Sequence, residues 1–131
     1  MPRLAKRIVR TEKAPAPFQG APYSQGIVVG DLVFVSGQVA VDPATSELVE
    51  GGIAEQTERV LENVGAVLEA AGSSLAKLVK TTIFLADLGD FAAMNEVYAR
   101  YVGESPPARA TFAVAALPAG ALIEIEAVAH L

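Results

Sequence analysis

The first third of the chain has the apolar pattern of β-structure. Two β-branched runs, residues 27–29 and 32–37, are separated only by Gly30-Asp31, and a two-residue loop of this kind predicts a β-hairpin. Both runs are apolar on both faces, so we expect the hairpin to be buried on both sides. Residues 6–9 predict a short edge strand before it, and residues 47–49 predict a short returning strand after it.

Two helices are predicted further along. Between residues 53 and 71 apolar side chains recur at helical spacing while acidic side chains take the other side, and Gly72 is placed to end this helix. Asp90 is expected to cap a second helix that runs through Tyr101. Its apolar stripe consists of Phe91, Met94, Tyr98 and Tyr101.

Three more strands are predicted, at residues 80–86, 110–116 and 122–129. The segment 117–121 contains Pro and Gly and is interpreted as the turn of a hairpin joining the last two. With the short segment 47–49 left out, the order β-β-β-α-β-α-β-β predicts a single α+β domain over residues 1–131, with a mixed sheet covered on one face by two helices. No element is left to cover the other face.

The composition suggests how that face is buried. Of 131 residues 52% are hydrophobic and only 19% are charged, yet no run reaches the ~18 apolar residues that suggest a membrane span. Obligate subunit interfaces resemble a domain core cut in half. We therefore expect a homo-oligomer, without a membrane partner and located in the cytoplasm.

The charge distribution argues against nucleic acid as a partner. The first 13 residues hold five of the ten basic residues and one of the fifteen acidic residues, so the remainder carries five cations against fourteen carboxylates. Such a body is a poor phosphate-binding surface. The chain has no cysteine and one histidine, His130, which leaves no zinc-thiolate site, no thiol nucleophile and no metal-binding cluster.

The candidate chemistry lies in the last quarter. Arg109 is the only Lys or Arg among the final 31 residues, and Glu124 and Glu126 share one face of an apolar strand. An arginine and a carboxylate held on stiff strands could bind a small anion and move a proton. The alternatives are that Arg109 only forms a structural ion pair with one of the glutamates, or that the glutamates lie on a solvated strand face. In the predicted hairpin Glu124 faces Val114, and Arg109 lies five residues further on, about 17 Å away. Either the hairpin is wrong, or Arg109 and Glu124 meet across a subunit boundary.

Short motifs in a fixed order point to a family. They are Ala21-Pro22-Tyr23-Ser24-Gln25-Gly26, Val35-Ser36-Gly37-Gln38, Glu69-Ala70-Ala71-Gly72, Val79-Lys80-Thr81-Thr82, Asp87-Leu88-Gly89-Asp90-Phe91, Pro107-Ala108-Arg109 and Ile123-Glu124-Ile125-Glu126-Ala127. From about residue 20 onward the chain closely resembles the reactive intermediate deaminase A (RidA) family. These are enamine/imine deaminases that were once described as translation inhibitors or endoribonucleases.

The resemblance implies a trimer of chorismate-mutase-like subunits with active sites in the clefts between them. It implies hydrolysis of 2-aminoacrylate-derived imines, 2-iminopropanoate and 2-iminobutanoate, to the 2-oxo acid and ammonia without a cofactor. Arg109 matches the arginine that clamps the substrate carboxylate, and Glu124 matches the carboxylate that activates water. The matching pocket positions are Tyr23, Ser36, Gly37 and Asn95.

The chain departs from the family pattern in two places. Thr111 stands in the pocket where many members have cysteine, and the segment 95–109 is a few residues short, which bears on the cleft rim. Ser36 has no neighbouring histidine, so we expect a hydrogen-bond donor and not a nucleophile. The main alternative function is a non-catalytic trimeric module that binds small carboxylates or a protein partner, and a second is RNA cleavage.

Overall fold

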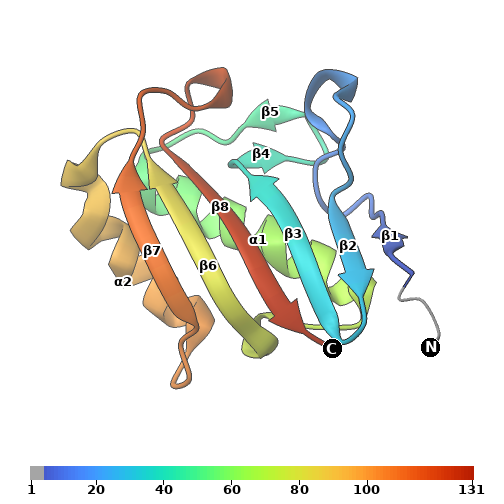
Figure 1. Ribbon diagram of the computed structural model, residues 1–131. Coiled ribbons are helices and arrows are strands. Elements are labelled where there is room, and N and C mark those ends of the chain that lie inside the picture. Colours follow the sequence, from blue (N-terminus) through green and yellow to red (C-terminus); the bar gives the residue numbers. More distant parts are fainter. Residues whose placement is uncertain (1–4) are drawn as a thin grey trace.

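Two layers make up the fold of the computed structural model, which describes residues 5–131 (Figure 1). The strands are β1 (Arg7–Val9), β2 (Gly26–Val29), β3 (Leu32–Gln38), β4 (Val41–Asp42), β5 (Glu47–Leu48), β6 (Leu78–Leu85), β7 (Ala108–Ala113) and β8 (Ile123–His130). The helices are α1 (Ile53–Ala71) and α2 (Phe91–Val102), and short 3-10 turns lie at Phe18–Gly20, Leu75–Lys77, Leu88–Asp90 and Pro118–Gly120. Six strands form one sheet in the order β1-β2-β3-β8-β6-β7, and β4 and β5 form a separate pair.

The predicted α+β class and most predicted elements are confirmed. The loop Gly30-Asp31 joins β2 to β3, with Val29 paired to Leu32. Helix α1 has the predicted bounds, and Gly72 ends it in the left-handed region at φ 91°, where a residue without Cβ is favoured. Strand β1 is an edge strand, as expected; Arg3, from the same basic stretch, lies outside the described residues.

The core lies between the sheet and α1. The apolar stripe of α1 places Val60, Leu61, Val64, Val67 and Leu68 out of contact with solvent. Facing them from the sheet are fully buried side chains, among them Val33, Ile83, Leu85, Ile123 and Ile125. Each strand therefore turns alternate residues toward the helices, and this alternation decides which face every candidate site residue occupies.

The predicted hairpin between the last two strands is wrong. Strand β6 lies between β7 and β8, pairing in parallel with β7 and antiparallel with β8. The connection after β7 crosses the end of β6: the Val114 amide donates to the Leu85 carbonyl, and the Ala86 amide donates to the Leu122 carbonyl. Apolar alternation predicts strands but not their partners, and a Pro/Gly turn fits a crossing as well as a hairpin.

A β-bulge interrupts β3 near its end. Val35 pairs with Ala127, but Gln38 pairs with Ile125, so Ser36 and Gly37 together oppose Glu126. Bulges re-aim side chains and are common beside active sites. Here the extra residue brings Gly37 against the side chain of Glu124.

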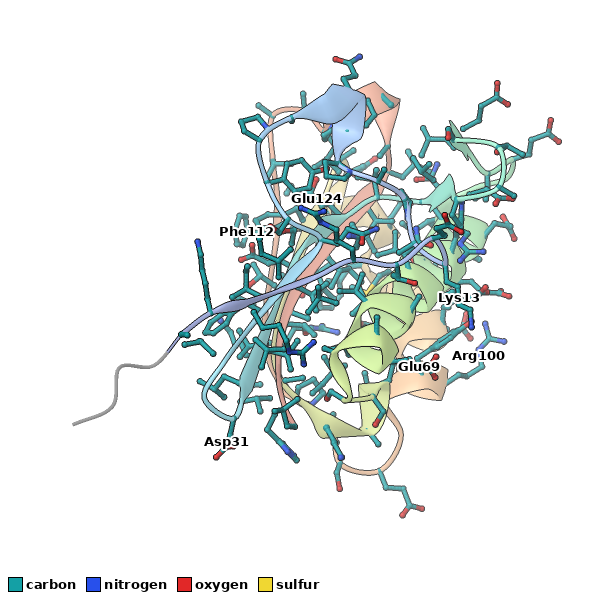
Figure 2. The ribbon with its side chains drawn as sticks, turned by 90° about the vertical axis from the view of Figure 1, so that its right-hand side faces the viewer. Lys13, Asp31, Glu69, Arg100, Phe112 and Glu124 are labelled. Carbon is teal, nitrogen blue, oxygen red and sulfur yellow. The ribbon has the colours of Figure 1, made fainter. Side chains whose placement is uncertain are left out.

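The sheet face away from the helices is open in this chain. Figure 2 shows the sheet nearly edge-on, with Phe112 on the side opposite Glu69 and Arg100 of the helical layer. Phe34 and Phe112 are 42% and 46% exposed, and Phe112 packs edge-on against Phe84. The expectation that the β2–β3 hairpin is buried on both sides is therefore not met within one chain: Val33 and Val35 face the core, and Phe34 faces solvent.

Candidate active site

Glu124 lies in a pocket of about 380 Å³ at one end of the sheet. Its lining residues come from the bulge of β3, from β8, and from the two loops that rise above this end of the sheet (Figure 1). They are Phe18, Tyr23, Ser36, Gly37, Val39, Pro118, Glu124 and Glu126. The structure thus brings together four of the predicted site residues: Tyr23, Ser36, Gly37 and Glu124.

The Glu124 carboxylate is half-buried against the backbone of Gly37. A Cβ placed at Gly37 would lie 2.9 Å from Glu124 Cδ, closer than real contacts allow. Burial raises the pKa of Glu124, and the negative charge of Glu126 on the same strand raises it further. A carboxylate whose pKa is raised toward neutrality is suited to take up a proton and to return it.

Two hydroxyls in the pocket have defined partners. Ser36 Oγ donates to the Ser24 carbonyl oxygen at 2.5 Å. Ser36 is thus a hydrogen-bond donor, as expected, and in this arrangement its acceptor is a backbone carbonyl. Tyr23 accepts a hydrogen bond from the Phe18 amide at 2.7 Å. The phenol keeps its own hydrogen for donation and is 43% exposed, as a substrate-orienting group would be.

Arg109 lies at the other side of the sheet, on the edge strand β7. Its Nη1 donates to Asn95 Oδ1 of α2 at 2.8 Å. Its guanidinium carbon lies 5.0 Å from the ring centroid of Tyr98 and 5.5 Å from that of Phe91, within cation–π range. The Asn95 amide oxygen therefore positions the Arg109 guanidinium. The remaining N–H groups of the guanidinium are left to bind a carboxylate.

Thr81 and Tyr98 fix the aromatic side of this cluster. Thr81 Oγ1 and Tyr98 OH share a buried hydrogen bond of 2.6 Å. Burial raises the pKa of Tyr98, although the Thr81 hydrogen bond and the Arg109 charge act in the opposite direction. The phenol therefore stays neutral near pH 7 and presents its ring face to Arg109. The sequence predicted Tyr98 and Phe91 only as part of the apolar stripe of the second helix, and their contact with the Arg109 guanidinium was missed.

Thr111 belongs with Arg109 and not with Glu124. It pairs with the buried Ile83 and so faces the helices. Its Oγ1 is buried and has no hydrogen-bond partner among the described residues. An orphaned buried hydroxyl is costly, so the Thr111 hydroxyl lowers stability in this arrangement.

The candidate residues thus form two separate clusters in one chain. Arg109 pairs with Thr81 and points toward α2, whereas Glu124 pairs with Phe84 on the open face. Arg109 and Glu124 are two strand spacings apart across the sheet and three residues apart along the strands, which is roughly 10 Å in each direction. Of the two alternatives drawn from the sequence, the first is therefore correct: the hairpin is wrong. Within one chain Arg109 and Glu124 still lie on opposite faces of the sheet.

Neither cluster has the make-up of a metal site. Over residues 5–131 no group of three or more His, Cys, Asp or Glu side chains is placed to hold a metal ion. In the same part of the chain no helix is long and apolar enough to cross a membrane.

Comparison with known proteins identifies the family to which this two-layer α+β chain belongs. Residues 11–131 match the family described as Endoribonuclease L-PSP. A RutC family protein of Pyrococcus abyssi is 55% identical over 97% of this chain and 98% of its own. The human 2-iminobutanoate/2-iminopropanoate deaminase is 46% identical over 98% of this chain and 93% of its own.

Solved structures agree with the fold. The crystal structure of RidA from an Antarctic Psychrobacter is 46% identical and has a TM-score of 0.91, covering 95% of this chain and 99% of that one. The chain belongs to the RidA family, as the motifs predicted.

Proposed function

We propose that this protein hydrolyses reactive enamine/imine intermediates, 2-iminopropanoate and 2-iminobutanoate, to 2-oxo acids and ammonia. The observation that carries the proposal is that the chain holds both a half-buried carboxylate of raised pKa, Glu124, and an arginine, Arg109, whose guanidinium is held by Asn95 at a free sheet edge. The 46% identity to the human deaminase supports the same substrate class.

The reaction follows from these two groups. Arg109 binds the substrate carboxylate bidentately, which orients the imine carbon. Glu124 takes a proton from a water molecule, and the resulting hydroxide adds to that carbon to give a carbinolamine. Protonated Glu124 returns the proton to nitrogen. The hydroxyl proton of the carbinolamine then passes to the amino nitrogen, directly or through Glu124, as the C–N bond breaks. Ammonia leaves, the 2-oxo acid forms, Glu124 is again ionised and no cofactor is consumed.

The two clusters require an assembly. We propose a homotrimer in which the Arg109 cluster of one subunit faces the Glu124 pocket of the next. Edge strand β7 carries Arg109, so a neighbour can reach it. The open sheet face, with Phe34 and Phe112 exposed, supplies the apolar surface that such an interface buries. Cytoplasmic location stays a prediction.

The test mixes the purified protein with 2-aminoacrylate generated in situ and follows ammonia and 2-oxo acid release. Acceleration over buffer that is lost in Arg109→Ala and in Glu124→Gln is the expected result. Full activity in either variant contradicts the mechanism. Carboxylate binding without turnover would favour the non-catalytic module, and salt-dependent RNA cleavage would favour the ribonuclease alternative.

A further inference from the structure

Helix α1 carries two buried amide side chains on its largely apolar stripe. Gln56 is 6% exposed and Asn63 is fully buried. They are seven residues apart, which is two helical turns, so both face the sheet layer. Neither is accounted for by the chemistry described above, and a buried amide in an apolar stripe is costly unless its hydrogen bonds are made.

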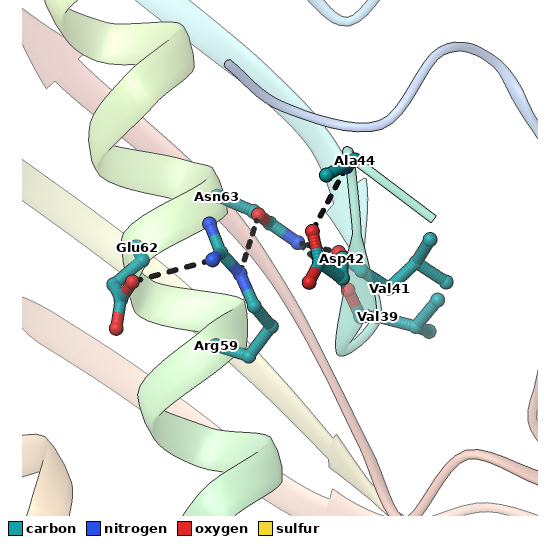
Figure 3. Close-up of polar contacts among 7 residues, drawn as sticks. All are labelled: Val39, Val41, Asp42, Ala44, Arg59, Glu62 and Asn63. Carbon is teal, nitrogen blue, oxygen red and sulfur yellow. Dashed lines mark hydrogen bonds and ion pairs between the residues drawn. The ribbon is translucent and has the colours of Figure 1, made fainter. Parts of the chain in front are cut away.

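Asn63 holds the chain segment that follows the β3 bulge (Figure 3). Its Nδ2 donates to the Val39 carbonyl at 3.1 Å and to the Val41 carbonyl at 2.9 Å. Its Oδ1 accepts from Arg59 Nε at 3.0 Å, and Arg59 pairs with Glu62 at 3.4 Å. The Asn63 amide nitrogen thus donates twice to the backbone of segment 39–41, and these hydrogen bonds fix the distance of that segment from α1.

Gln56 holds the residue that leads into β8. Its Oε1 accepts a hydrogen bond from the Leu122 amide at 2.9 Å. The Leu122 carbonyl accepts in turn from the Ala86 amide at the end of β6. Leu122 is therefore held on both sides, by α1 and by the sheet, two residues before Glu124.

One anchored segment follows β3 and the other leads into β8, and these neighbouring strands form two walls of the Glu124 pocket. Gly37 and Val39 line it from the β3 side, and Glu124 enters it from β8. Because Glu124 contacts the Gly37 backbone directly, a shift of either wall relative to the other changes the position and hydration of the carboxylate.

We propose that Gln56 and Asn63 are positioning residues that hold the two walls of the Glu124 pocket at a fixed separation from α1. The inference rests on the proposed function for its kinetic consequence, but not for its structural one. Besides Glu124, the titratable groups that line this pocket are Glu126 from β8 and Tyr23 from the loop before β2.

The sharpest test uses Gln56, because its contact needs only an acceptor oxygen. Gln56→Met keeps the length and removes the acceptor, whereas Gln56→Glu keeps the acceptor. Thr57→Val is the matched control, because Thr57 is fully buried on the same helix and its Oγ1 has no partner among the described residues. We expect kcat of Gln56→Met to fall about 10- to 100-fold with KM within about 2-fold, because Arg109 lies at the other side of the sheet. Thr57→Val is expected to stay within about 3-fold of the unaltered protein, and Gln56→Glu, which keeps the acceptor oxygen, is expected to retain more of kcat than Gln56→Met.

A second measurement does not depend on turnover. Carboxyl-carbon NMR follows the titration of Glu124, whose signal is assigned by its absence in Glu124→Gln. In Gln56→Met, water reaches the loosened pocket, so the Glu124 titration moves to lower pH; in Thr57→Val it does not. Asn63→Leu tests the β3 wall in the same way, should Gln56→Met not fold.

The outcomes separate the two proposals. If the unaltered protein does not deaminate imines but the Glu124 titration still moves in Gln56→Met, the positioning role stands and the proposed function falls. If Gln56→Met and Asn63→Leu only lower the melting temperature, while kcat and the Glu124 titration stay unchanged, the two amides are merely structural and the inference is overturned.

Discussion

Arg109 and Glu124 lie on opposite faces of the same sheet, with β6 between their strands. Arg109 is turned toward α2 by its hydrogen bond to Asn95, while Glu124 is turned toward the bulge of β3 by its contact with Gly37. Each chain therefore carries both parts of the proposed machinery and cannot combine them on one substrate.

Complementation between two inactive variants follows from this separation. Arg109→Ala and Glu124→Gln are each expected to be nearly inactive alone. When the two chains are co-folded in equal amounts, about a quarter of the intersubunit sites receive an intact Glu124 from one chain and an intact Arg109 from its neighbour. Ammonia release near that fraction of the unaltered rate is expected. No recovery in demonstrably mixed trimers would place the whole site within one chain.

Lysine is not expected to replace Arg109 in binding the substrate carboxylate. Arg109→Lys keeps the charge but loses the planar fork, the contact with Asn95 and the stacking on Tyr98. We expect kcat/KM to fall about 10- to 100-fold, mainly through KM, which corresponds to the loss of a charge-assisted hydrogen bond. Arg100→Lys, on the exposed side of α2, is the matched control. Equal loss in both variants would point to a general charge effect.

The ionised Glu124 carboxylate is expected to lower the stability of the folded chain at neutral pH. The pKa of Glu124 is raised above its ordinary value of 4.5 in the folded chain, so the folded state binds this proton more tightly than the unfolded state. The stability that this provides is fully present below the unfolded pKa and is lost as pH rises through the folded pKa. Glu124→Gln should therefore melt at a higher temperature than the unaltered protein at about pH 7, with the difference shrinking below about pH 4. A lower melting temperature at neutral pH would contradict the burial argument.

Glu126 is expected to set the pH range of the reaction. Its charge contributes to the raised pKa of Glu124, so Glu126→Gln should move the acidic limb of the kcat/KM profile to lower pH without abolishing turnover. A pH series of initial rates for both proteins checks this. An unmoved limb would show that burial alone sets the Glu124 pKa.

Gly37 is expected to tolerate no side chain. A Cβ there meets the Glu124 carboxylate, so Gly37→Ala displaces the base and should lower kcat about 100-fold. Because the displaced group is the end of a flexible side chain, the free energy of unfolding should change by less than about 2 kcal/mol. Steady-state kinetics and denaturant titration on the same sample separate the two effects. A large loss of stability with normal kcat would refute the assignment.

Much of the fold was predictable because its signals are local. The stripe of α1 and Gly72 defined that helix, and Gly30-Asp31 defined the first hairpin. The partner of β8 was not predictable, because apolar alternation in residues 123–129 is satisfied by any neighbouring strand, and β6 is more than 30 residues earlier in the chain.

The candidate site was predicted as a list of residues but not as a geometry. Motifs identified Tyr23, Gly37, Arg109 and Glu124, yet no pattern showed that they divide between two faces. The role of Asn95 as the holder of Arg109 also needed the structure. Gln56 and Asn63 did leave a signal that was missed, since both are polar residues at positions where the spacing of α1 calls for apolar ones.

The place of β8 in the sheet also bears on how the chain folds during synthesis. This strand, the last in the sequence, lies between β3 and β6 and joins the pieces β1-β2-β3 and β6-β7. Until residues 123–130 have left the ribosome, each piece exposes an unpaired strand edge. The closing step of folding is thus also the step that places Glu124, so a nascent chain that lacks its end has neither a continuous sheet nor a base.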